Sequence, residues 1–410
     1  MISLNHEYIL ILQNEISLSM KIDKGIVSHA LEHYTYLHRH PELSFHESGT
    51  RNYVENVLSG LDISYERVGS NGIVAMLPGR DSGRTIALRA DMDALPITED
   101  DAHEICSLHP GIMHACGHDL HTACLLGAAE YMCRQSAQLP VNVMLIFQHA
   151  EELLPGGAVD ILESPFFKRH LPEWIIGQHA EPDLEVGHVG VCPGPYMASG
   201  DEIYITLRGP GGHAALPHQS RDLLLISSHI VVALQQITSR LASPQIPTVL
   251  TFGNIRCQSS MNIIPKEVTL EGTFRTFDGL WRAKAKEHIR QISQAIAESM
   301  GAESEISIVE GYPVLYNDTG KTLAAIEVLK RNLGRENISI LACRMTTEDF
   351  ARYSQKIPAT FLRLGVRGES NCGKLHTSGF YADPSVLPIG IQTLCCLALS
   401  YPKLIDKQLI

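Results

Sequence analysis

The sequence predicts an α/β fold in which a larger domain is interrupted by a smaller one. The chain has 410 residues, 44% of them hydrophobic, which is more than one core usually supports. Its first part alternates helical patterns with short apolar runs, as in a sheet covered by helices on both faces. Its middle part changes to the order β-α-β-β-α-β, which is that of a ferredoxin-like sandwich.

The elements of the first part follow from hydrophobic periodicity. Ile26, Ala30 and Tyr34 recur at helical spacing and predict a helix. Short apolar runs predict buried strands, and a longer amphipathic stretch predicts a second helix. In chain order these are a strand over 85–90, a helix over 117–136, and strands over 141–147 and 174–177.

The middle and last parts complete the two domains. The middle part is predicted as a strand over 202–207, a helix over 222–239, strands over 248–255 and 268–277, a helix over 281–300 and a strand over 305–309. We therefore expect an inserted domain over 190–309. The last part returns to the first pattern, with a helix over 322–332, a strand over 360–364 and a helix over 385–399. The larger domain would then be discontinuous, over 1–189 and 310–410.

Composition excludes several partners. The formal net charge is −12 and no run rich in Lys or Arg occurs, so binding to nucleic acid or anionic lipid is not expected. No apolar run was found to reach the roughly 18 residues that cross a bilayer, so no membrane segment is expected. The apolar patch over 8–12 lacks the basic start of a signal peptide, which predicts a cytoplasmic chain with a short N-terminal helix or arm. The ten cysteines form no disulfide framework. Most of them lie in apolar surroundings and are expected to be buried free thiols, and Cys116 is the exception.

Residues 113–121 (MHACGHDLH) are the densest group of metal-binding residue types. Three histidines, one cysteine and one aspartate lie there, at the start of a predicted helix. Thiolate and neutral imidazole are good ligands for zinc and similar metals. Gly117 allows the chain to bend between Cys116 and His118. A polar helix cap with incidental histidines is the alternative.

Two adjacent carboxylates, Glu151 and Glu152, directly follow the predicted strand over 141–147. Adjacent side chains diverge, so one can bind a metal while the other faces a substrate. A carboxylate beside an activated water is what a metallohydrolase needs as its general base. The alternative is a solvated acidic start to a loop.

His179 and His376 are weaker candidates when taken alone. The chain has 20 histidines, so chance matches are expected. His179 follows the predicted strand over 174–177, and His376 lies in a loop ahead of the last helix. Such positions at strand ends and loops of one sheet are where α/β proteins place their sites.

Short motifs occur in a specific order from about residue 30 to the C-terminus. They are LHRHPELSF at 37–45, RADMDALP at 89–96, HACGHDLH at 114–121, EE at 151–152, GGHAALPH at 211–218, NIIP at 262–265, GTFRT at 272–276 and EDF at 348–350. Together they closely resemble the aminoacylase/hippurate hydrolase group of metallopeptidase-like amidohydrolases. That group includes hydrolases of auxin–amino acid conjugates and deacetylases of N-acetyl amino acids.

The resemblance implies a zinc-peptidase-like α/β catalytic domain with an inserted ferredoxin-like dimerisation domain. It implies two divalent metal ions per subunit (Zn, Mn, Ni or Co), with Glu151 as the general base. One thiolate, one carboxylate and three imidazoles suit a borderline metal better than calcium or magnesium. Asp91 and Asp93, at a strand end, would orient the ligands, or else they only make the turn before Pro96. The implied ligands are Cys116, His118, Glu152, His179 and His376.

The resemblance also gives roles to three residues of the inserted domain. His213 would reach the active site of the partner subunit and polarise the scissile carbonyl, which implies a homodimer or higher homo-oligomer. Asn262 and Arg275 match positions near the substrate. Arg275 could hold an amino-acid carboxylate bidentately, or it could be a charge on a strand face.

Three features depart from the usual pattern of this group and leave the substrate subgroup open. His149 stands where proline is common before the glutamate pair, and Pro384 stands where an acidic residue is often found. About 25 residues precede the matching region. None of these features removes an implied ligand.

The predicted activity is hydrolysis of N-acyl (acetyl, benzoyl or similar) amino acids to a carboxylate and a free amino acid. A dipeptidase or carboxypeptidase on the same fold is the nearest alternative. A non-catalytic metal-binding or ligand-binding protein is a second alternative, and the intact ligand set with Glu151 disfavours it. A thiol enzyme with Cys116 as nucleophile is a third, because a cysteine near histidine can be activated.

Overall fold

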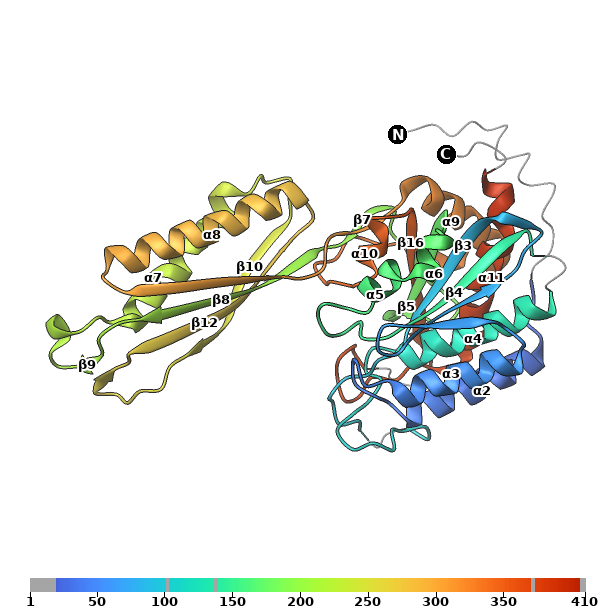
Figure 1. The fold of residues 1–410 in the computed structure, drawn as a ribbon, viewed down its shortest axis with the longest axis horizontal. Helices are drawn as coiled ribbons and strands as arrows, with labels where there is room; N and C mark the ends of the chain where they lie inside the picture. Colours follow the sequence, from blue (N-terminus) through green and yellow to red (C-terminus); the bar gives the residue numbers. More distant parts are fainter. Residues whose placement is uncertain (1–19, 101–102, 136–138, 370–372, 406–410) are drawn as a thin grey trace. The chain divides into compact units, whose positions relative to one another are not determined.

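The computed structural model describes residues 20–100, 103–135, 139–369 and 373–405 (Figure 1). The arm expected at the N-terminus lies outside these residues. The chain divides into two compact units. Unit 1 comprises Met1–Pro193, Asp318–Leu341 and Ile357–Ile410, and unit 2 comprises Gly194–Asn317 and Ala342–Lys356.

Unit 1 is built on an eight-stranded sheet with the order β1-β2-β4-β3-β5-β16-β6-β15. Its central strands β4, β3, β5 and β16 run parallel to one another. Every residue of β4 is buried, so both faces of the sheet are covered there. The strands are β1 (Tyr65–Val68), β2 (Gly72–Leu77), β3 (Asp81–Asp91), β4 (Val141–Gln148), β5 (Trp174–Glu185), β6 (Val189–Val191), β15 (Ile338–Ile340) and β16 (Ala359–Arg367).

The helices of unit 1 pack on each other and on the sheet. Asp23 begins the first of them, because its side chain accepts the N–H of Gly25 at 2.8 Å. Gly127 in α4 lets α11 approach closely, since an added Cβ would lie 2.5 Å from Ile391. The helices are α2 (Lys24–Arg39), α3 (Ser48–Gly60), α4 (His118–Arg134), α5 (Ala158–Glu163), α6 (Pro165–Arg169), α9 (Thr319–Leu333) and α11 (Leu387–Ile405).

One segment corrects the expectation that no apolar run reaches the length of a membrane span. Among the described residues, the stretch Pro384–Tyr401, which includes most of α11, is long and apolar enough by length and composition. However, 61% of this window is buried inside the protein, and its side chains belong to the main hydrophobic core. A buried core helix meets the same criterion because it too needs apolar residues on most of its faces.

Unit 2 contains a four-stranded sheet with the order β10-β12-β8-β13, in which every neighbouring pair is antiparallel. Its main elements follow the order β-α-β-β-α-β, which confirms the ferredoxin-like expectation. One face of the sheet packs on α7 and α8, where Ile203, Ile205 and Leu207 alternate with more exposed residues. The elements are β8 (Ser199–Arg208), α7 (Leu223–Leu234), β10 (Thr248–Arg256), β12 (Glu267–Thr276), α8 (Gly279–Ser299) and β13 (Glu303–Glu310).

The bounds of unit 2 differ from the continuous insertion expected over 190–309. The unit extends to Asn317 and includes the separate segment Ala342–Lys356. This segment joins unit 2 through backbone hydrogen bonds: Arg344 N–H donates to Tyr196 O at 2.9 Å, and Ala198 N–H donates to Arg344 O at 3.1 Å. Hydrophobic periodicity could not assign residues 342–356 to unit 2, because this segment has little regular structure beyond α10 (Ala351–Ser354).

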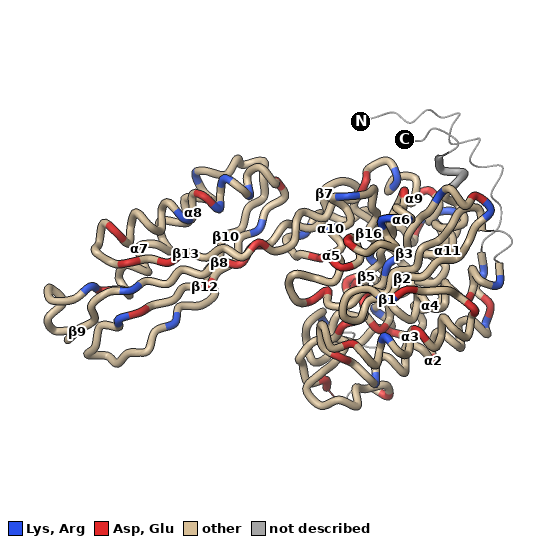
Figure 2. Tube along the Cα trace, viewed as in Figure 1, with Lys and Arg blue, Asp and Glu red and all other residues tan. Residues whose placement is uncertain are grey.

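Charged residues of both signs are spread along each unit rather than segregated (Figure 2). Most charged pairs lie at the surface, where each contributes little to stability. The pair Arg282–Asp201 is an exception. Its nitrogen–oxygen distance is 2.7 Å with both side chains buried, and it ties α8 to β8 inside unit 2.

Candidate metal centre

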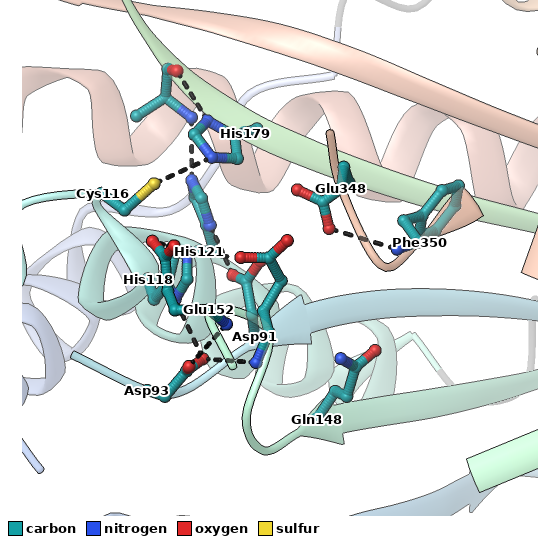
Figure 3. Close-up of polar contacts among 12 residues, drawn as sticks. Asp91, Asp93, Cys116, His118, His121, Gln148, Glu152, His179, Glu348 and Phe350 are labelled. Atoms are coloured by element: carbon teal, nitrogen blue, oxygen red, sulfur yellow. Dashed lines mark hydrogen bonds and ion pairs between the residues drawn. The ribbon is translucent and has the colours of Figure 1, made fainter. Parts of the chain in front are cut away.

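Side chains from separate segments of unit 1 converge near the carboxyl ends of its parallel strands (Figure 3). Parallel strands bring their carboxyl ends to one edge of a sheet, which is where α/β folds place their sites. The contributing residues are Asp91 at the end of β3, Asp93 just beyond it, Cys116 and His118 at the start of α4, Glu151 and Glu152 after β4, His179 in β5 and His376 in the loop before α11.

The five predicted ligands lie beside one another. The Sγ atom of Cys116 lies 3.2 Å from His179 Nε2 and 3.3 Å from His376 Nε2. Glu152 Oε1 lies 3.2 Å from His376 Nε2 and 3.9 Å from His118 Nε2. The structure therefore forms two groups whose ligand atoms lie within 4.8 Å of one another, Cys116–His118–His179 and Cys116–Glu152–His376.

The chemistry of these groups fits a bound cation. His118 is fully buried, and its Nε2 atom makes no hydrogen bond within the described part of the chain. Its other ring nitrogen, Nδ1, lies 3.2 Å from Asp93 Oδ1, and Nε2 lies 3.6 Å from Asp91 Oδ2 and 3.9 Å from Glu152 Oε1. A buried polar atom without a hydrogen bond is costly, and a metal ion would satisfy it.

Asp91 holds a second buried network behind the ligands. Its Oδ1 atom lies 2.6 Å from His121 Nδ1, and its Oδ2 atom accepts from Arg89 at 2.6 Å. His121 Nε2 in turn accepts the N–H of Ala180, the residue after His179, at 2.8 Å. The network thus links the end of β3 to the middle of β5 through α4, and it fixes the backbone that carries His179.

The protonation states of the buried ligands differ for physical reasons. Burial lowers the pKa of His179 well below its usual range, which leaves a neutral imidazole. Burial also lowers the pKa of His118, but the carboxylates of Asp91 and Asp93 outweigh this effect and raise it to about 10. A cation would replace that proton.

The environment of Cys116 bears on the thiol-enzyme alternative. Burial, reinforced by the carboxylates of Glu152 and Glu151, raises the pKa of this thiol well above its usual range. A nucleophilic cysteine needs a lowered pKa, because the thiolate is the reactive form. The surroundings of Cys116 therefore favour a ligand that loses its proton to a metal over a free nucleophile.

Gly117 makes the bend that the sequence suggested between Cys116 and His118. Its φ is +82°, and an added Cβ would lie 2.9 Å from the Cβ of Ala180. We expect Gly117→Ala to lower the free energy of unfolding by about 2–4 kcal/mol, from the left-handed backbone plus overpacking. Gly111 is a matched control, since its φ is +83° and no heavy atom lies within 4 Å of an added Cβ. Gly111→Ala should lose only about 1–2 kcal/mol. Urea unfolding of both metal-free variants measures the difference, and equal losses would contradict the steric argument.

Of the three residues proposed in the inserted domain, His213 and Asn262 lie together, and Arg275 lies far from both within unit 2. His213, in β9 (Gly212–His213), pairs with Ile263 of β11 (Ile263–Ile264), so Asn262 is its neighbour. Arg275 pairs with Gly200 near the other end of β8 and β12 and donates to Met345 O at 2.9 Å. A ten-residue strand such as β12 spans about 30 Å. One copy of unit 2 therefore cannot bring His213 and Arg275 to the same substrate.

Several residues around the site have no role in the sequence-based prediction. His121 could have been found, because it lies three positions after His118 and so on the same helix face. His38 could not, since its partners Asp119 and Glu99, at 2.6 and 2.8 Å, are far from it in sequence. Glu47 was missed for the same reason, because it accepts the N–H of Ala150, 103 positions away.

A parallel α/β sheet with a Cys/His/Glu cluster and a neighbouring carboxylate at its strand ends is the arrangement of a metallohydrolase. Comparisons with known proteins agree. Residues 87–400 match the model of the peptidase family M20/M25/M40. The chain is 40% identical to N-acyl-L-amino acid amidohydrolase of Geobacillus stearothermophilus over 287 residues, which are 70% of this chain and 77% of that protein.

Two further relatives cover nearly the whole chain. N-acetylcysteine deacetylase of Bacillus subtilis is 36% identical over 379 residues, covering 92% of this chain and 98% of that protein. The crystal structure of a dinuclear metal-binding peptidase of the M20 family, also from Bacillus subtilis, superposes with a TM-score of 0.78. It is 32% identical and covers 93% of this chain and 100% of that one.

The chain belongs to the peptidase family M20/M25/M40. The resemblance inferred from the ordered motifs is thereby confirmed, and with it the expectation of a hydrolase that acts on amide bonds. The residues that bind metal and substrate were predicted from sequence and remain a proposal.

Proposed function

We propose that this protein hydrolyses the amide bond of N-acyl amino acids at a site that binds two divalent metal ions. The main support is the position of Glu151. Its carboxylate lies within 4.8 Å of the ligand atoms of His118 and Glu152, and the residue is only 5% exposed. A buried carboxylate beside a metal-ligand cluster is suited to take a proton from a water molecule.

The residues proposed to hold the ions are Cys116, His118, Glu152, His179 and His376. Cys116 belongs to both ligand groups, as a ligand shared by two ions would. When bound, such ions polarise the substrate carbonyl and lower the pKa of a coordinated water. The soft thiolate and the imidazoles favour Zn, Mn, Ni or Co, and this donor set does not choose among them.

Glu151 carries the proton in the proposed reaction. Its carboxylate accepts a proton from water as the water oxygen bonds to the amide carbon. The same carboxyl group then donates that proton to the leaving nitrogen as the C–N bond breaks. The carboxylic acid so formed gives the second proton of the water to the released amine or to solvent, so the products are a carboxylate and a free amino acid, and atoms and charge balance without a further reactant.

His213, Asn262 and Arg275 are proposed to bind the substrate in a homodimer or higher homo-oligomer. Because His213 and Arg275 lie at opposite ends of the unit 2 sheet, we infer that His213 and Asn262 act on the site of a partner chain. His213 would donate to the scissile carbonyl, and Arg275 would pair with the carboxylate of the substrate. The oligomeric state and a cytoplasmic location stay predictions.

A substrate panel separates the acylase from its nearest alternative. Metal-reconstituted protein would be assayed with N-acetyl, N-benzoyl and dipeptide derivatives of the same set of amino acids, N-acetylcysteine among them. We expect kcat/KM for the best N-acyl amino acid to exceed that for the matching dipeptide by at least about tenfold, which corresponds to roughly 1.4 kcal/mol. A preference for dipeptides would favour the peptidase alternative. No turnover with any loaded metal would favour the non-catalytic one.

A further inference from the structure

Three consecutive backbone N–H groups at the end of β4 all donate to buried carboxylates. The N–H of Ala150 donates to Glu47 Oε1 at 2.8 Å. The N–H groups of Glu151 and Glu152 donate to the two oxygens of Asp93, at 3.0 and 2.9 Å. Two carboxylates therefore hold the turn over residues 150–152 by hydrogen bonds. This turn carries the proposed general base, Glu151, and one proposed ligand, Glu152.

This turn needs to be held. Ala150 has a φ of +49°, in the left-handed region that L-residues other than glycine adopt at a cost of roughly 1–2 kcal/mol. Its carbonyl is held as well, because it accepts the N–H of Gly157 at 3.0 Å. Such strain persists only where the surroundings over-determine the backbone, and it is common at functional sites.

The side chain of Glu47 accepts a hydrogen bond from the turn and does not cap the helix that follows it. It stands at the N-cap of α3, yet its side chain makes no capping hydrogen bond there. Instead the carboxylate is fully buried, accepts from Phe45 N–H at 2.9 Å, and takes the side-chain amide of Asn71 at 3.0 Å. Burial, together with the nearby charge of Asp93, raises its pKa to about 7, because the charged form is costly in these surroundings.

We propose that Glu47 is a positioning residue for Glu151. By holding Ala150 in the left-handed conformation, Glu47 sets the direction in which the next side chain leaves the backbone. Asp93 fixes the two following residues and also contacts His118, so it couples the turn to the ligand cluster. The inference rests on the proposed function and deepens it.

Kinetics of matched variants test the proposal. Glu47→Ala should lower kcat by roughly 10–100-fold, since a misplacement of about 1 Å can cost that much. KM and metal content should stay within about twofold of the original protein, because no proposed ligand is removed. Glu47→Gln keeps an acceptor for the N–H of Ala150, so its kcat should lie between those of Glu47→Ala and the original protein. Glu55→Ala is the control, because Glu55 is a buried glutamate of α3 that pairs with Arg67 and Arg51 and not with the turn. Its kcat should be unchanged.

A second substitution distinguishes positioning from general support of the fold. Glycine adopts a positive φ at no steric cost. Adding Ala150→Gly to Glu47→Ala should therefore restore kcat by roughly fivefold or more. A merely structural role for Glu47 predicts no such rescue. The inference is overturned if the double variant gains nothing, or if Glu47→Ala and Glu55→Ala have the same kcat.

Hydrogen exchange tests the turn without any activity. In metal-free protein, Glu47→Ala should accelerate exchange of the amides of residues 150–152. Glu47→Gln should accelerate it less, because it keeps an acceptor for Ala150, and Glu55→Ala should not change it. Unchanged exchange in both Glu47 variants would overturn the inference whatever the substrate proves to be. If the original protein hydrolyses nothing in the panel, the proposed function fails while the exchange result still decides the role of Glu47.

Discussion

Glu151→Gln is expected to lower kcat by on the order of 10²–10⁴-fold, because the amide side chain can neither accept the proton of water nor return it to the leaving nitrogen. Metal content and folded structure should be kept, since Glu151 is not among the proposed ligands and glutamine has nearly the same shape. Steady-state kinetics on the best substrate, with metal per chain measured on the same preparation, checks this result. The original and variant proteins must carry equal metal for the comparison to hold.

Glu163→Gln is the matched control for Glu151. Glu163 is a largely exposed glutamate of α5 that pairs with Lys168 at the surface. Its loss should leave kcat within about twofold, because exposed ion pairs contribute little. If Glu151→Gln turned over substrate as fast as Glu163→Gln, Glu151 would lose its role as general base, and the proton path would have to be reassigned.

Cys116→Ser is expected to have the second large effect, on metal binding. A serine hydroxyl does not lose its proton as a thiol does, so both ligand groups would lose their shared anionic ligand. We expect metal affinity to fall by more than the 10–100-fold typical for loss of an outer partner of a metal ligand. Metal per chain after dialysis, measured by elemental analysis, is the direct measurement, and activity should fall with it.

Cys124→Ser is the control for Cys116. Cys124 is a buried cysteine of α4, the helix that begins just after Cys116, and its Sγ atom lies 3.9 Å from the carbonyl of Leu387. This variant should keep its metal. If Cys116→Ser kept the original metal ratio as well, Cys116 would not be a ligand. A thiol enzyme would instead be inactivated by alkylation and be indifferent to chelators, so chelation with recovery on metal addition separates the two mechanisms.

The family, the fold class and the candidate ligands could all be predicted before the structure was known. Local patterns were sufficient for many elements: the helical spacing of Ile26 and Ala30 identified α2, and the apolar run over 141–147 identified β4. The run over 113–121 was informative because its residue types have few uses in common other than metal binding. These patterns involve residues within one turn of helix or one strand, so they can be recognised from the sequence alone.

Only the tertiary structure decided which distant residues meet. Cys116 and His376 are separated by 260 positions, and Glu47 and Ala150 by 103, yet each pair is in contact. Residues 342–356 joined unit 2 through backbone hydrogen bonds, which leave no trace in side-chain periodicity. The physical reason is that local propensity sets the conformation of each segment, whereas contacts between segments depend on how their surfaces pack. The sequence by itself thus determined the helices and strands and most of the candidate metal ligands. Packing between segments determined that the carboxylate of Glu47 binds the turn beside Glu151.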